Sequence, residues 1–201
     1  MAIDFKKTAV KGHTPEIWRG ECKILPGGFK PVQSFPIGTV LHRGTPIFVD
    51  FAAMSAAVCK TAKVLAGGTT TAFRVAKGHL FAVGDVVTKN GDGASTPTIK
   101  SIDTTNADYD VITLSAAYTG LAADDIVVES EAVEEGKASA KYEPNMVVGA
   151  VKEFNGKGLP TIDAGYDAIL LKSVCTPFPA SWLVENGFCL KANPNILIIN
   201  Q

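Results

Sequence analysis

Short runs of β-branched and aromatic residues dominate the chain from Gly38 onward, and most of them are followed by a glycine, proline or Asp/Asn-rich turn. In the run 46–51 (PIFVDF), Ile47, Val49 and Phe51 recur at every second position, so one face of a strand can meet a core. Short strands that alternate with turns favour a small barrel or sandwich. The sequence therefore predicts a mostly β protein.

The predicted strands form two groups that are separated by composition. Outer strands are expected at 39–42, 46–51, 56–65, 146–154, 167–175, 188–191 and 195–200, and middle strands at 72–76, 85–89, 96–102, 109–115 and 125–129. One short helix is expected from Pro179 through Glu185, because proline suits a first helical turn. Within the middle group, segments 82–89 and 122–129 resemble each other weakly, as two turns that end in Asp and feed a β-branched strand.

Charge divides the chain in the same way. Residues 1–63 hold nine Lys/Arg and four Asp/Glu, whereas residues 64–143 hold six and twelve. Glycines at 67 and 68 and the polar segment 134–137 bound the acidic block, as expected at a domain junction. We therefore predict an inserted acidic β module at 68–141, a discontinuous β core at 36–67 and 142–201, and an extended N-terminal arm at 1–35.

The predicted arm combines basic and apolar residues with three prolines, at 15, 26 and 31. Proline disfavours a helix, and large apolar side chains are costly to leave in water, so the arm is expected to lie on a partner's surface. The residues expected to bind that partner are Lys6, Lys7, Lys11, Ile17, Trp18, Arg19 and Phe29.

The sequence carries no recognisable catalytic or metal-binding motif. Its four cysteines are widely spaced, and its three histidines lie in different segments with no acid placed beside them in sequence. The oxygen donors Asp103, Asn106, Asp108 and Asp110 raise the alternative of a Ca²⁺ loop, but a solvated hairpin turn is the default for such residues. No enzyme activity, cofactor or metal is expected.

The order of several segments resembles the lambda-type capsid decoration proteins of tailed bacteriophages. The matching pieces are PIFVDF (46–51), VVGAVK (147–152) and PASWL (179–183). The segments FRVAKGHLFAVGDVVT and IKSIDTTNADYDVITL in the acidic block resemble insertions in head-fibre proteins of phages that infect gut bacteria. The resemblance implies a homotrimer on the outside of a phage head, bound to the major capsid protein, with a small β-barrel or β-tongue core.

Two functions follow as hypotheses. In the first, the protein is a structural component of the virion, assembled in the host cytoplasm, which reinforces the capsid and displays the β module outward. In the second, the module is a head-fibre adhesin for host-surface or mucus carbohydrate, with Tyr109 and Tyr118 as stacking platforms.

The aromatic residues Phe178, Trp182 and Phe188 are expected at the oligomer interface. Nucleic acid and membrane are not expected partners, since the basic charge is scattered and no apolar run approaches roughly 18 residues.

Overall fold

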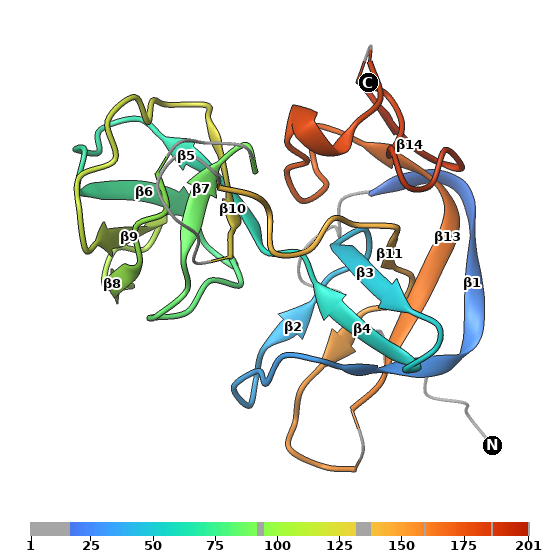
Figure 1. Cartoon of the computed structure of the whole chain (residues 1–201). Helices are drawn as coiled ribbons and strands as arrows, with labels where there is room; N and C mark the ends of the chain where they lie inside the picture. The colour runs from blue at the N-terminus through green and yellow to red at the C-terminus, as the bar shows by residue number, and fades with distance from the viewer. Residues whose placement is uncertain (1–16, 92–94, 132–137, 159, 186, 201) are drawn as a thin grey trace, which may run out of the picture.

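The computed structural model describes residues 17–91, 95–131, 138–158, 160–185 and 187–200. It is mostly β, as predicted, with two six-stranded sheets and one two-stranded sheet. The two large sheets form separate units that lie side by side (Figure 1). We call the unit that contains both ends of the described chain the first unit, and the unit built from the middle of the chain the second unit.

A closed barrel forms the centre of the first unit. Its sheet runs in the order β1-β4-β3-β11-β13-β14, and β1 also pairs with β13, so the first five strands of that order close on themselves. β2 and β12 form the small additional sheet. The strands are β1 (Trp18–Pro31), β2 (Val40–Leu41), β3 (Pro46–Asp50), β4 (Ser55–Val58), β11 (Met146–Val148), β12 (Lys152–Glu153), β13 (Ile162–Leu171) and β14 (Ile196–Ile199).

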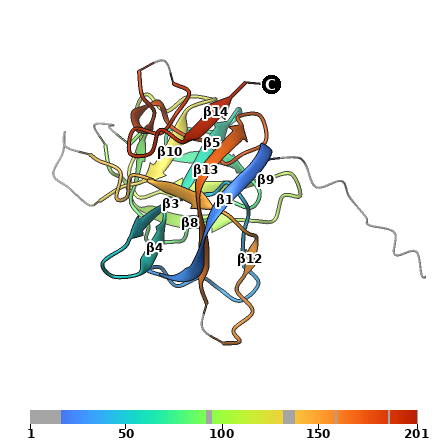
Figure 2. The ribbon, with the colours of Figure 1, turned by 90° about the vertical axis from the view of Figure 1, so that its right-hand side faces the viewer.

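Close packing between β1 and β13 completes the barrel. The two long strands run antiparallel beside each other, as both views show (Figures 1 and 2). At Gly28, which has φ of 63°, an added Cβ would lie 2.6 Å from the Cβ of Thr161, so no larger residue fits without a shift. Apolar side chains from β1, β3, β4, β11 and β13 fill the interior, including Phe29, Val49 and Ile162.

The second unit is also a curled sheet, in the order β7-β10-β5-β6-β9-β8. Its two edges approach each other, because Val86 beside β7 forms a bridge with Thr98 beside β8. Its core contains Phe73, Val75 and Ile112. The strands are β5 (Thr61–Leu65), β6 (Ala72–Ala76), β7 (Val87–Lys89), β8 (Ile99–Asp103), β9 (Tyr109–Leu114) and β10 (Ile126–Glu129).

The two similar segments noticed in the sequence do adopt the same turn. The carboxylate of Asp85 accepts a hydrogen bond from the Ala82 amide at 2.7 Å, and Asp125 accepts one from Ala122 at 2.6 Å. The residue before each aspartate, Gly84 or Asp124, has a positive φ. The turns lead into β7 and β10, which pair antiparallel with each other.

The boundary between the units differs from the predicted one. The expected strand 56–65 is two strands, and the chain leaves the first unit at Cys59 and Lys60. β5 then lies between β10 and β6 in the second sheet, so it belongs to the middle module rather than to the core assigned to 36–67. Similarly, the expected strand 146–154 divides into β11 and β12. Periodicity marked these runs as extended but carried no information on which sheet they join.

Two further expectations are corrected. Residues 18–31 are not an extended arm, because they form β1 and close the barrel through main-chain pairing with β13. The predicted helix from Pro179 through Glu185 is a single 3₁₀ turn, η1 (Ala180–Trp182). Within the described ranges, no helix has the length and apolar character needed to span a membrane.

The junction between the units is built from specific contacts. The hydroxyl of Thr61 donates a hydrogen bond to the carbonyl of Pro177 at 2.8 Å, and the hydroxyl of Ser181 donates one to the carbonyl of Asn90. Val128 of β10 packs in one apolar cluster with Phe178 and Trp182. Side-chain packing and hydrogen bonds therefore hold the second unit against the first, in addition to the covalent connections of the chain.

Candidate interaction groove

The residues predicted to bind a partner from the arm divide into four groups. Lys6, Lys7 and Lys11 lie outside the described residues. Ile17 and Trp18 pack partly buried against the first unit, and the guanidinium of Arg43 lies 5.4 Å from the centre of the Trp18 ring. Arg19 is exposed. The prediction for Phe29 is wrong, because this side chain is 3% exposed inside the barrel and is therefore not accessible to a partner.

The predicted oligomer interface is corrected in the same way. Phe178 and Trp182 are 6% and 3% exposed, with ring centres 6.5 Å apart, and they pack on Val128 of the same chain. Their proximity in sequence reflects a contact between the two units. Only Phe188 of the three is exposed, at 51%.

The predicted glycan platform is not present as a pair of exposed rings. Tyr118 is 4% exposed in the core of the second unit, and its hydroxyl accepts a hydrogen bond from the Lys89 amide at 2.9 Å. Tyr109 is partly exposed, but the guanidinium of Arg74 covers its ring at 4.6 Å from the centre. Tyr118 is therefore not a stacking residue.

The acidic segment proposed as an alternative calcium loop has other hydrogen-bonding roles. The side chains of Asp103 and Asn106 accept hydrogen bonds from amides two residues ahead, at 3.0 and 2.9 Å, as in Asx turns. Asp110 pairs with Lys77 at 2.5 Å and with His79 at 3.3 Å. Among the described residues, no cluster of His, Cys, Asp and Glu could hold a metal ion.

The cysteines are free thiols in the part of the chain that is described. Burial raises the pKa of the Cys59 and Cys22 thiols, and it raises the pKa of Cys175 to about 11. These three side chains therefore stay protonated at neutral pH, when a reactive cysteine would need to be a thiolate.

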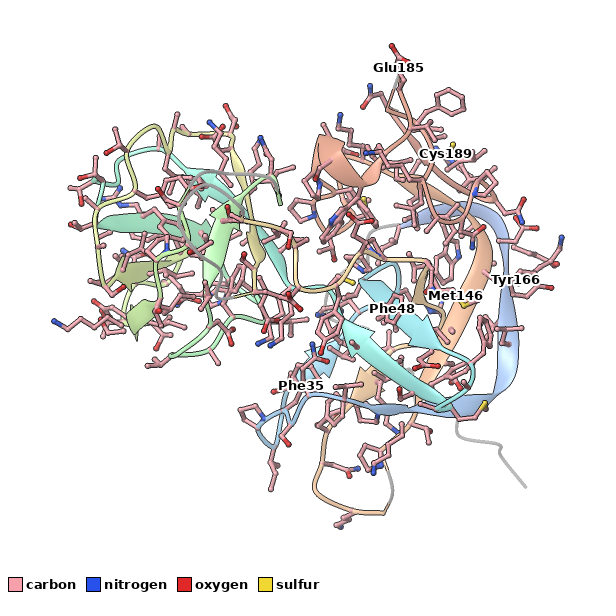
Figure 3. All side chains as sticks on the ribbon, in the orientation of Figure 1. Phe35, Phe48, Met146, Tyr166, Glu185 and Cys189 are labelled. Carbon is pink, nitrogen blue, oxygen red and sulfur yellow. The ribbon has the colours of Figure 1, made fainter. Side chains whose placement is uncertain are left out.

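A groove of about 670 Å³ lies at one end of the first unit, where β1 ends. We call it the basal groove. Phe35, one of its lining residues, lies at the end of the unit opposite Glu185 (Figure 3). Its floor includes Phe35 and Phe154, whose rings lie 4.9 Å apart. Its size falls in the range of about 300 to 1,000 Å³ typical of ligand-binding clefts.

Exposed apolar side chains and lysines line the basal groove together. Val32, Ile37 and Met54 are 54%, 78% and 50% exposed. They come from the segment after β1, from the segment before β2 and from the β3–β4 turn. Lysines at 30, 152 and 157 also line the groove. Such a mixture of accessible apolar and cationic side chains is typical of a surface that meets another molecule.

The groove lysines differ from those of the second unit in their pairing. Lys30, Lys152 and Lys157 form no ion pair within the described ranges. By contrast, five lysines in or beside the second unit each bind a carboxylate, namely Lys60, Lys63, Lys77, Lys89 and Lys141. Among the described residues, positive charge therefore exceeds negative charge at the basal groove, where three lysines and one carboxylate, Glu153, lie.

Sequence reasoning did not find this groove, although a weak signal was present. Val32 and Ile37 are single apolar residues that each follow a proline, outside any predicted strand, where no core position accounts for them. Lys30 and Lys152 are too far apart in the sequence for spacing to connect them. Their proximity arises only when the barrel closes.

Comparison with known proteins gives no further identification: no protein-family profile, curated protein or solved structure matches the chain.

Proposed function

We propose that the protein is a structural component of a phage virion that binds the outer surface of the head as a homotrimer, through the first unit, and carries the second unit outward. It reinforces the capsid and performs no catalysis. The observation that carries this proposal is the basal groove, which concentrates exposed apolar side chains at one end of the first unit, with lysines that form no ion pair to any described residue.

The arrangement of the two units supports an attachment role. The second unit adjoins the first through β5, β10 and the 3₁₀ turn, and Leu80 of the second unit packs against the apolar cluster that contains Phe154. All the residues that line the basal groove belong to the first unit. A partner can therefore occupy the groove without displacing the second unit. A protein that binds only the assembled head stabilises it by mass action, because it lowers the free energy of that state alone.

The adhesin hypothesis has less support, because Tyr118 is buried and Arg74 covers Tyr109. For the arm, the lysines at 6, 7 and 11 keep their proposed part in attachment, where they would mainly affect the association rate.

Cryo-electron microscopy of the parent virion tests the proposal. We expect density for this chain at threefold or quasi-threefold positions on the outside of the head, with the basal groove facing the shell. A purified virion that lacks the protein, as judged by mass spectrometry, would contradict the proposal. Density at the tail or inside the head would contradict it equally.

A further inference from the structure

We propose that the basal groove binds an extended acidic segment of the capsid protein, which lies along the free edge of β12. This inference rests on the proposed function and names the chemistry of the partner at the same site. The first argument is charge. Of the described residues that line the groove, three are lysines and Glu153 alone is acidic. A partner with carboxylates would compensate these lysines and be guided toward them by attraction.

The second argument is the backbone of β12. This strand pairs with β2 through Lys152 and Glu153 and has no second neighbour among the described strands. A strand that pairs on one side only leaves amide and carbonyl groups available for an added strand. Both residues of β12 line the groove, so the inference places the partner's main chain along this edge. Main-chain hydrogen bonds of this type require an extended segment.

The third argument is the position of the apolar side chains. An added Cβ on Gly156 would lie 3.0 Å from Cδ1 of Ile37, so the 155–158 turn and Ile37 pack together in one wall. Met54 and Val32 supply further apolar contacts in the same groove. An extended segment presents alternate side chains to opposite faces, so acidic and apolar residues in alternation would meet the lysines and this wall respectively.

Two measurements on the full-length protein test the inference. In the first, a fluorescein-labelled ten-residue peptide of alternating Glu and Val is titrated with the protein, with fluorescence anisotropy as the readout. We expect saturable binding that weakens as salt increases. A Lys/Val peptide of the same length should not bind. In the second, the protein is sedimented with undecorated heads.

Matched variants connect both measurements to the groove. The combination Lys30→Glu, Lys152→Glu and Lys157→Glu should lower affinity for the peptide and for heads by at least about tenfold, and Ile37→Ser should lower it by roughly tenfold. The controls are Lys100→Glu and Val83→Ser, which change exposed residues of the second unit. Both controls should bind like the wild type. Circular dichroism and thermal unfolding establish that each variant is folded.

The outcomes separate the two proposals. Unchanged binding of heads by the charge-reversed protein, or equal binding of the acidic and basic peptides, would overturn the inference and leave the proposed function standing. Failure of the wild-type protein to bind heads would overturn the proposed function and, with it, the capsid segment as the partner. If the charge-reversed variant is unfolded, neutral Lys152→Met and Lys157→Met substitutions replace it, with the same expected direction of change.

Discussion

Nε2 of His79 lies 3.3 Å from Oδ2 of Asp110, and both side chains are 7% exposed. Nδ1 of the same ring accepts a hydrogen bond from the Phe81 amide at 3.2 Å, so in the neutral ring the proton is on Nε2 and points to Asp110. Burial lowers the pKa of His79 below its ordinary value of 6.5, and Lys77 adds to this effect. The carboxylates of Asp110 and Asp85 act in the opposite direction but do not outweigh it.

This histidine predicts a pH dependence of stability. Because its pKa is lower in the folded than in the unfolded state, the unfolded chain binds the proton first as pH falls below about 6.5. The free energy of unfolding should therefore decrease from pH 7 toward pH 5. His79→Asn, which can keep the acceptor for the Phe81 amide, should reduce this slope. Urea unfolding at several pH values measures the effect, and equal slopes in the wild type and the variant would contradict it.

Lys60 is expected to be essential for the stability of the junction. Its side chain is 7% exposed, and its ammonium lies 2.7 Å from Asp85 and 3.5 Å from Glu129. Lys60→Met would leave two carboxylates in a buried site without this cation, which should cost about 3 to 5 kcal/mol. Lys63→Met removes an exposed pair with Asp124 and should cost only about 0 to 1 kcal/mol. Chemical denaturation of both variants provides the comparison, and equal losses would show that the buried pair has no special role.

Adding a side chain at Gly28 should destabilise the barrel. Gly28→Ala combines a positive φ with a Cβ contact of 2.6 Å to Thr161, so we expect a loss of about 1 to 3 kcal/mol. Gly20 has a similar φ of 69° but open space around an added Cβ. Gly20→Ala should therefore cost less, and the difference in melting temperature between the variants isolates the steric part. A smaller loss at position 28 than at position 20 would contradict this account.

The position of β5 predicts how the second unit can be removed. Replacing residues 68–141 by a Gly/Ser linker would leave β5 without β6 and β10, its two neighbours. That protein should aggregate, because both edges of an apolar strand are exposed. Replacing residues 60–141 should preserve a cooperative but less stable barrel, since Phe178 and Trp182 lose Val128. Thermal unfolding and light scattering compare the two deletions. Equal solubility and stability would argue against the boundary at Lys60.

Self-association should depend on Phe188 rather than on its two buried neighbours. If the chain forms a trimer, Phe188→Ser should shift the population toward the monomer in multi-angle light scattering, because this ring is exposed. Trp182→Ala should instead lower the melting temperature, with a cost of about 3 to 5 kcal/mol for a large buried side chain. A Phe188→Ser protein with unchanged oligomeric state would exclude this residue from the interface.

Local patterns predicted most strands, because alternation and turn chemistry are properties of neighbouring residues. The turns at Asp85 and Asp125 are an example, since each carboxylate bonds to an amide three residues earlier. Which of the two large sheets each strand joins was harder to infer. The run 56–65 is continuously extended in character, yet Val58 belongs to the first unit and Thr61 to the second. The sequence of β1 predicts an arm rather than a strand, because its three register irregularities and its glycines hide the alternation of a regular strand.

The candidate site was less accessible to sequence reasoning than the fold. Sequence alone predicts Phe178 and Trp182 at an oligomer interface, because aromatic side chains close in sequence suggest an exposed patch. The residues around 178–182 carry no sign that Val128, about 50 positions earlier in the sequence, packs against these two rings. The basal groove joins Lys30 to Lys152 and Lys157, and this proximity depends on long-range closure of the barrel.

The pairing of Trp18 with Leu170 also sets an order of events during synthesis. The strands of the second unit, from Thr61 to Glu129, are all translated before β13. The second unit can therefore fold on the nascent chain, whereas β1 has to wait for a partner at the far end of the sequence. During that interval Phe29 and the edge of β1 are exposed to solvent. A slow stretch of translation before β13 would lengthen this interval and favour misassembly between neighbouring nascent chains.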